Sequence, residues 1–208
     1  MNHHLGIYII NKQSFIVINI TATLTASYSQ LTMDVNRLLS DLCRDYDSSI
    51  ILKEEQRNVL QSLLLSDRPV LANLPTGYGK SLIIHLLPAA LRMQQKRQLG
   101  TVIVICPLNS IQQDQLTKLN SKNIKACSLS VSCKAKQLNE SSEDDIDDNL
   151  VMENCNIDEI VGGYFDLIYA HPEAFFNTKT GKELLRNEKF TDNVIGVCVD
   201  ECHILLEW

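Results

Sequence analysis

A glycine-containing loop between a short apolar run and a helical segment constrains this chain more than any other feature. The loop, LPTGYGKS, covers residues 74–81, an apolar run covers 70–74, and apolar spacing predicts a helix over 82–93. A strand–loop–helix unit of this kind directs backbone N–H groups and the positive end of a helix dipole at one place, which suits a phosphate group. Lys80 can reach that phosphate, and the Ser81 hydroxyl can bind a divalent cation. The predicted phosphate-contacting residues are Pro75, Thr76, Gly77, Tyr78, Gly79, Lys80 and Ser81.

Strand-like and helix-like segments alternate along most of the chain. Apolar strand patterns occur at 70–74, 101–106, 124–129, 165–170 and 194–200. Helical spacing occurs at 34–46, 53–65, 82–93 and 111–119. Because strands that alternate with helices usually form a parallel sheet, we predict an α/β fold with helices on both faces of that sheet. A chain of 208 residues has room for one such domain, which we place at 33–208.

Two consecutive carboxylates follow the last predicted strand. Asp200 and Glu201 would lie at the carboxyl edge of the parallel sheet, which is also the edge of the phosphate loop. Taken alone, this run could be a helix cap with a histidine at the edge of the core. Together with the phosphate loop it predicts phosphoryl transfer, with Asp200 and Ser81 holding Mg²⁺ and Glu201 orienting or deprotonating the attacking water.

Composition excludes several classes of protein. Six carboxylates within 140–148 account for the whole formal charge of −6, so the rest of the chain is balanced and carries no strongly basic patch. We interpret 134–163, which contains this acidic run, as a solvated surface insertion. The seven cysteines form no C-x-x-C pair, which argues against a disulfide framework or a zinc module and favours a reducing intracellular compartment. No apolar stretch is long enough to span a membrane, and we do not expect the protein to bind a membrane.

Residues 1–32 differ from the rest of the chain. They contain apolar, β-branched runs followed by a Thr/Ala/Ser stretch. We interpret them as an extension of unclear role, with Met33 as the more natural start. A secretory or membrane-anchoring role is the alternative.

Five blocks in order resemble the RecQ-type DNA helicases of superfamily 2. They are LKEEQ at 52–56, LPTGYGKS at 74–81, CPLNSIQQDQ at 106–115, AHPE at 170–173 and DECHILLEW at 200–208. The resemblance covers residues 50–208, and the final Glu-Trp pair favours RecQ over the DEAD-box RNA helicases. His85 is interpreted only as a packed helix residue.

The resemblance implies a RecA-like P-loop lobe, the incomplete first lobe of a two-lobe helicase. It implies ATP and Mg²⁺ as cofactors, DNA as partner, a nuclear location and 3′–5′ unwinding in DNA repair or recombination. Gln56 would read adenine, and Lys80, Asp200, Glu201 and His203 would act in catalysis. The implied DNA-contacting residues are Pro107, Leu108, Asn109, Ser110, Gln115, His171, Pro172, Glu173 and Trp208.

Some residues depart from the RecQ pattern. Glu54 and Glu55 replace Pro-Gly before Gln56, which bears on adenine selectivity, and His171 replaces a small hydroxyl residue. The second lobe, with its arginines, is absent from this sequence, so we expect the chain alone to be inactive or very weak. Two alternatives stay open: a short nucleotide-binding or interaction module that does not unwind, and another nucleic-acid-dependent ATPase of the same superfamily.

Overall fold

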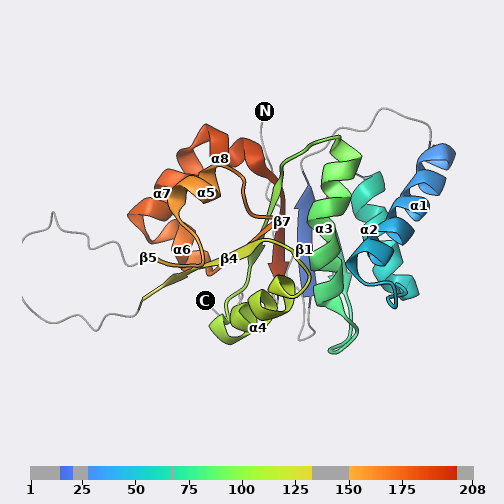
Figure 1. Ribbon diagram of the computed structural model, residues 1–208, viewed down its shortest axis with the longest axis horizontal. Helices are drawn as coiled ribbons and strands as arrows, with labels where there is room; N and C mark the ends of the chain where they lie inside the picture. The colour runs from blue at the N-terminus through green and yellow to red at the C-terminus, as the bar shows by residue number, and fades with distance from the viewer. Residues whose placement is uncertain (1–14, 21–27, 67, 133–149, 201–208) are drawn as a thin grey trace, which may run out of the picture.

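The computed structural model describes residues 15–20, 28–66, 68–132 and 150–200, in which strands and helices alternate as predicted (Figure 1). The strands are β1 (Phe15–Ile20), β2 (Val70–Asn73), β3 (Thr101–Ile105), β4 (Ala126–Val131), β5 (Leu150–Glu153), β6 (Leu167–Ala170) and β7 (Val194–Asp200). The helices are α1 (Tyr28–Tyr46), α2 (Glu54–Leu65), α3 (Lys80–Gln95), α4 (Asn109–Asn120), α5 (Ile157–Val161), α6 (Pro172–Phe176), α7 (Lys179–Arg186) and α8 (Glu188–Asn193).

The described strands form one sheet in the order β2-β1-β7-β3-β6-β4-β5. Strands β7, β3, β6 and β4 are parallel, which confirms the predicted parallel core. Strand β1 is antiparallel to both of its neighbours, so β2 runs in the same direction as β7. Strand β5 pairs antiparallel with β4 at the opposite end of the sheet.

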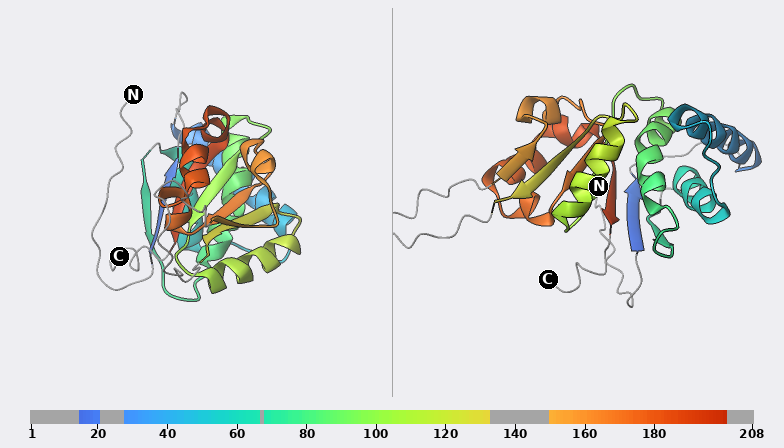
Figure 2. Two further views of the ribbon diagram at one scale, coloured as in Figure 1. Left: turned by 90° about the vertical axis from the view of Figure 1, so that its left-hand side faces the viewer. Right: turned by 60° about the horizontal axis from the view of Figure 1, so that its bottom comes forward.

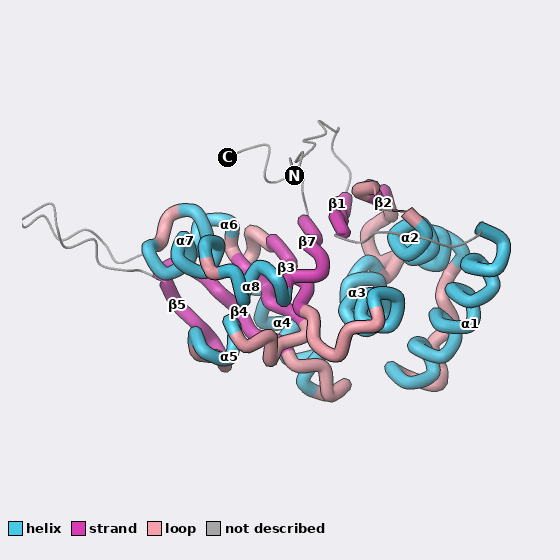
Figure 3. The backbone as a smooth tube through the Cα atoms, turned by 90° about the horizontal axis from the view of Figure 1, so that it is seen from above, coloured by secondary structure: helices cyan, strands magenta, loops and turns pink. Residues whose placement is uncertain are grey.

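Helices cover both faces of this sheet, and each face has its own apolar core (Figures 2 and 3). The alternation along β3 sends Val102 and Val104 into the core under α1–α4 and Ile103 into the core under α5–α8. A strand buried on both faces needs a continuous apolar run, which explains the sequence VIVI at 102–105. The predicted α/β fold with helices on both faces is confirmed.

Two segments of the first 32 residues are described, and both belong to the folded domain. Strand β1 lies inside the sheet, paired with both β2 and β7, and α1 begins at Tyr28. The predicted boundary between residues 32 and 33 therefore falls within a helix. The physical reason is the run FIVINI, whose β-branched residues favour an extended strand. Pairing of β1 with both β2 and β7 also satisfies the backbone groups along the facing edges of these two strands.

The prediction that 134–163 is a surface insertion is wrong for the second half of this range. Strand β5 and helix α5 occupy part of it, and Ile160 is buried in the core under α5–α8. Asn156 begins α5 with a capping box, in which its side chain accepts from the Glu159 backbone and the Glu159 side chain accepts from the Asn156 backbone. The acidic run at 140–148 lies outside the described residues.

Two further features of the described residues are their cysteines and the hydropathy of their helices. All five described cysteines are reduced, including the buried Cys106 and Cys198 at the ends of β3 and β7. Within the same residues, no helix combines the length and the apolar character that crossing a bilayer requires.

Candidate functional site

The sheet register brings four predicted blocks to one edge, the lower edge of the sheet in Figure 1. Asp200 and Ala72 both pair with Ile16 of β1, so the end of β7 lies level with the end of β2. At about 4.8 Å per strand spacing, Asp200 and the start of the phosphate loop are roughly 10 Å apart across β1. Because β3 and β6 are parallel to β7, the blocks that follow Ile105 and Ala170 emerge at the same edge.

The phosphate loop is built by two glycines with left-handed backbones. Gly77 has φ +77° and Gly79 has φ +94°, conformations that other residues adopt only with strain. Between them, the Tyr78 N–H donates to the Pro75 carbonyl at 3.1 Å and closes the turn. Gly79 is the N-cap of α3, so the helix begins at Lys80 with its first N–H groups directed at the loop. A Cβ atom at Gly77 would meet nothing within 4 Å, so this side of the loop is open to a ligand.

The side chain of Gln56 stabilises the phosphate loop by hydrogen bonds to its backbone. Its side chain is 3% exposed, and its Nε2 group donates to the carbonyls of Tyr78 at 3.1 Å and of Gly79 at 3.0 Å. Its Oε1 accepts from the Lys53 N–H at 2.9 Å, while the Lys53 ammonium lies 4.3 Å from the centre of the Tyr78 ring. Both Nε2 hydrogens are therefore used within the protein, and only a lone pair of Oε1 is left to meet a base. The expected reading of adenine by Gln56 stays a prediction.

The carboxylate predicted to bind Mg²⁺ is buried at the end of β7. Asp200 is 8% exposed and sits at the shared edge, while Lys80 and Ser81 begin α3 beside the loop. Carboxylate and hydroxyl oxygens are the ligands that Mg²⁺ prefers in proteins. Glu201, His203 and Trp208 lie outside the described residues.

The block after β3 exposes three side chains at the start of α4. Leu108, Asn109 and Ser110 are exposed, whereas Pro107 is buried. Gln112, which the sequence reading passed over, is buried and donates to the Cys106 carbonyl at 2.7 Å, which holds the turn before the helix. Next to this helix start lies a polar hollow of about 220 Å³, and its lining includes Asn109, Ser110, Gln112, Gln113, Ser128, Ser130 and Glu153.

The block after β6 contacts the block after β3. The His171 Nε2–H donates to the Pro107 carbonyl at 2.9 Å, and His171 Nδ1 lies 3.6 Å from a Glu173 carboxylate oxygen. His171 is also the N-cap of α6, which has Pro172 as its first residue. Two of the predicted nucleic-acid blocks, far apart in sequence, thus form one surface.

Gln115 departs from the expected pattern because its side chain points into the protein. It is 7% exposed, and its Oε1 accepts a hydrogen bond from His85 Nε2 at 2.8 Å. Its place on the inner face of α4 explains the difference, since Leu116 and Leu119 on the same face are buried in the core. The sequence prediction treated Gln115 as a DNA contact and His85 as packing, and it missed that the two residues are bonded partners.

Comparisons with known proteins show that this chain is similar to helicases. Residues 53–208 match the DEAD/DEAH box helicase family. The chain is 32% identical over 144 residues to ATP-dependent helicase SGS1 of Saccharomyces cerevisiae, covering 69% of this chain and 9% of that protein. It is 31% identical over 137 residues to ATP-dependent DNA helicase Q1 of Rattus norvegicus, covering 65% and 18%. It is 28% identical over 156 residues to the bifunctional 3′-5′ exonuclease/ATP-dependent helicase WRN of Mus musculus, covering 75% and 9%.

The chain spans less than a fifth of the length of each of these three relatives. The matched region includes the phosphate loop, both blocks of the shared surface and Asp200, and the relatives are those that the RecQ-like motifs predicted. The chain therefore belongs to the DEAD/DEAH box helicase family, with RecQ-type helicases among its relatives.

Proposed function

We propose that this chain forms the ATP-binding lobe of a RecQ-type, ATP-dependent DNA helicase. The single observation that carries the proposal is the shared sheet edge, where the phosphate loop, Asp200 and the surface formed by the 107–110 and 171–173 blocks meet. The proposed reaction of the whole protein is ATP hydrolysis coupled to 3′–5′ unwinding of DNA in repair or recombination. Polarity, pathway and a nuclear location rest on the RecQ resemblance.

The nucleotide end of the site fits a triphosphate with a divalent cation. The open side of Gly77, the first N–H groups of α3 and Lys80 suit the negative oxygens of a phosphate chain. Ser81 and Asp200 would hold Mg²⁺, which when bound supplies positive charge to the transferred phosphoryl group. Glu201, next in sequence to Asp200, would orient the attacking water. His203 would connect the nucleotide to the nucleic acid.

The other end of the site fits the backbone of a nucleic acid strand. Asn109 and Ser110 are exposed at the N-terminus of α4, where side-chain donors and backbone N–H groups suit a phosphodiester. His171 and Glu173 border them through the contact of His171 with Pro107. Leu108 and Pro172 would add apolar contact to the sugar or base, and Trp208 is proposed to stack on a base.

Removing the Lys80 ammonium tests the nucleotide half of the proposal. We expect Lys80→Ala to weaken binding of a fluorescent ATP analogue with Mg²⁺ about 30-fold, because one charge-assisted contact to phosphate contributes about 2 kcal/mol. The full 208-residue chain is used because β1 is part of the sheet beside the loop. Lys118→Ala is the matched control, since it removes an exposed lysine whose ammonium pairs with Asp114 within α4. Equal affinity of the Lys80→Ala chain and the wild type would refute a working phosphate loop.

A substitution of Gln56 tests whether its side chain stabilises the phosphate loop or recognises the adenine base. In Gln56→Ala the carbonyls of Tyr78 and Gly79 lose their donors, so we expect ATP and GTP affinity to fall by the same factor, about tenfold. Titration with fluorescent analogues of both nucleotides measures the two factors. A loss confined to ATP would instead assign Gln56 to adenine.

A further inference from the structure

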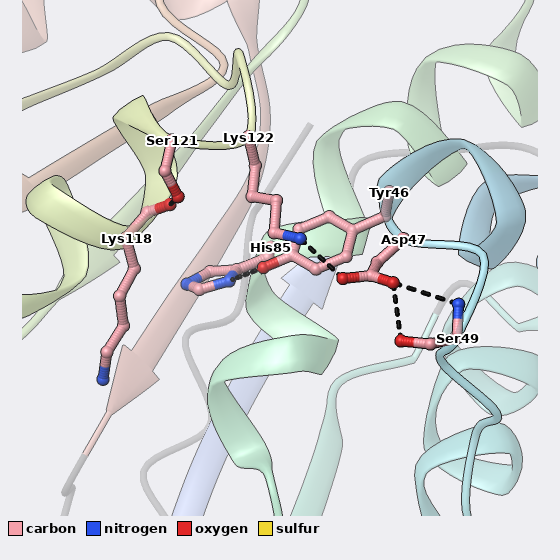
Figure 4. A network of polar contacts seen from close by, with 7 residues as sticks. All are labelled: Tyr46, Asp47, Ser49, His85, Lys118, Ser121 and Lys122. Carbon is pink, nitrogen blue, oxygen red and sulfur yellow. Dashed lines mark hydrogen bonds and ion pairs between the residues drawn. The ribbon is translucent and has the colours of Figure 1, made fainter.

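His85 is a buried polar residue in the middle of α3 that bridges two other helices. It is 5% exposed, and its Nδ1 lies 2.9 Å from the Tyr46 hydroxyl at the end of α1 (Figure 4). Its Nε2 lies 2.8 Å from Gln115 Oε1 on α4. One side chain therefore joins α1, α3 and α4.

The direction of both hydrogen bonds follows from the chemistry of the partners. Burial lowers the pKa of His85 to about 4, with a smaller lowering by the nearby Lys118 ammonium and an opposing effect of the hydrogen bond to Gln115, so the ring is neutral at pH 7. Gln115 Oε1 can only accept, which requires the single ring proton on Nε2. Nδ1 then accepts from the Tyr46 hydroxyl. Both ring nitrogens are used, and the tautomer is set by its two partners.

The hydrogen bond between His85 and Gln115 connects α3 and α4. The proposed nucleotide end of the site lies at the start of α3, and the proposed nucleic-acid end lies at the start of α4. His85 follows Lys80 by five residues on α3, and Gln115 follows Ser110 by five residues on α4. At 1.5 Å per residue, the bridge lies about 7 Å along each helix axis from the nucleotide end and from the nucleic-acid end. No helix end or loop intervenes on either side.

Sliding α3 against α4 would break a hydrogen bond between two buried side chains. Because His85 is 5% exposed and Gln115 is 7% exposed, separating the two side chains costs the free energy of this hydrogen bond. A displacement of α3 that keeps this hydrogen bond must therefore be accompanied by a displacement of α4 at Gln115.

We propose that His85 is a positioning residue that couples nucleotide binding at the start of α3 to nucleic-acid binding at the start of α4. The inference rests on the proposed function, because it names the residue that connects the two ends of that site. It predicts that each ligand changes the affinity of the other, by the same factor in both directions.

A second connection in the same region provides a control. Lys122, in the turn after α4, donates to the Asp47 carboxylate at 2.7 Å and lies 5.3 Å from the centre of the Tyr46 ring (Figure 4). This pair joins α1 to α4 but does not touch α3. Lys122→Met thus breaks a connection between helices and leaves the proposed bridge intact.

The test measures how an oligothymidylate changes the affinity of the full chain for a non-hydrolysable fluorescent ATP analogue with Mg²⁺. We expect oligothymidylate to change the affinity for the ATP analogue by a factor of at least about five in the wild type and in Lys122→Met. In His85→Gln the amide nitrogen replaces imidazole Nε2 and keeps the bond to Gln115, so the factor should persist. In His85→Asn the amide replaces Nδ1, the bond to Gln115 is lost, and the factor should fall below about twofold.

The outcomes separate this inference from the proposed function. Nucleotide affinity without DNA should change less than about twofold among these variants, because His85 does not touch the phosphate loop. A wild type that binds neither ligand would refute the proposed function, and the inference with it. A wild type that binds both, with no coupling or with coupling unchanged in His85→Asn, would overturn the inference alone. Tyr46→Phe, which keeps the bond between α3 and α4, should behave as wild type and replaces His85→Gln if that variant does not fold.

Discussion

A Gly79→Ala substitution is expected to destroy the phosphate loop while leaving the rest of the fold in place. Gly79 has φ +94°, which is strained by about 1–3 kcal/mol for any residue with a side chain. A Cβ atom there would also lie 2.5 Å from Gln56 Nε2, so the amide must move and give up its bonds to Tyr78 and Gly79. Together these effects reach about 4 kcal/mol, or a loss of roughly a thousandfold in affinity for Mg·ATP.

Gly77→Ala is the matched control for this substitution. Gly77 also has a positive φ, +77°, but an added Cβ would meet nothing within 4 Å, so only backbone strain of about 1 kcal/mol is expected. Urea unfolding of both variants measures the difference in the free energy of unfolding without any ligand. Equal destabilisation by the two substitutions would show that Gln56 does not pack under Gly79.

Much of the fold could be predicted because its strongest signals are local. The run at β3 is apolar from Val102 to Ile105, since the strand is buried on both faces, and the phosphate loop has its glycines where the backbone needs a positive φ. Because alternation with helices predicts parallel strands, whose carboxyl ends share one edge, the meeting of Asp200 and the loop at that edge could also be predicted.

What could not be predicted depends on contacts between residues far apart in the chain. The β-branched composition of β1 favours a strand, but nothing local shows that it pairs between β2 and β7. The amide of Gln56 has the same chemistry whether it meets a base or the carbonyl of Tyr78. His85 likewise carries no local mark of its partners, which lie 39 and 30 residues away.

The site also shows why the RecQ resemblance located blocks better than individual contacts. A block is a local sequence pattern. Four of the five blocks reach one edge through the strands that precede them, and Gln56 in the remaining block contacts the phosphate loop from α2. The direction of each side chain within a block depends on helix periodicity. On α4 this periodicity turns Ser110 outward and Gln115 inward, although both belong to one motif.

Acidification is expected to destabilise the folded chain through His85. Burial holds its pKa at about 4 in the folded state, against 6.5 when the chain is unfolded. Between these values the unfolded state binds a proton that the folded state does not, so the free energy of unfolding falls as the pH drops from 6.5 to 4. A difference of about 2.5 pH units corresponds to about 3 kcal/mol, fully present above pH 6.5 and lost near pH 4.

Comparison with His85→Gln isolates this contribution from that of the carboxylates. Asp47, whose pKa is held low by hydrogen bonds from Lys122 and Ser49, loses its stabilising charge only at lower pH and is present in both chains. Urea unfolding at a series of pH values gives the free energy of unfolding of each chain, and their difference should shift by about 3 kcal/mol in favour of the variant between pH 7 and 4. Parallel curves for the two chains would mean that His85 accepts a proton in the folded state as readily as in the unfolded one. Burial of the ring would then not keep His85 neutral below pH 6.5.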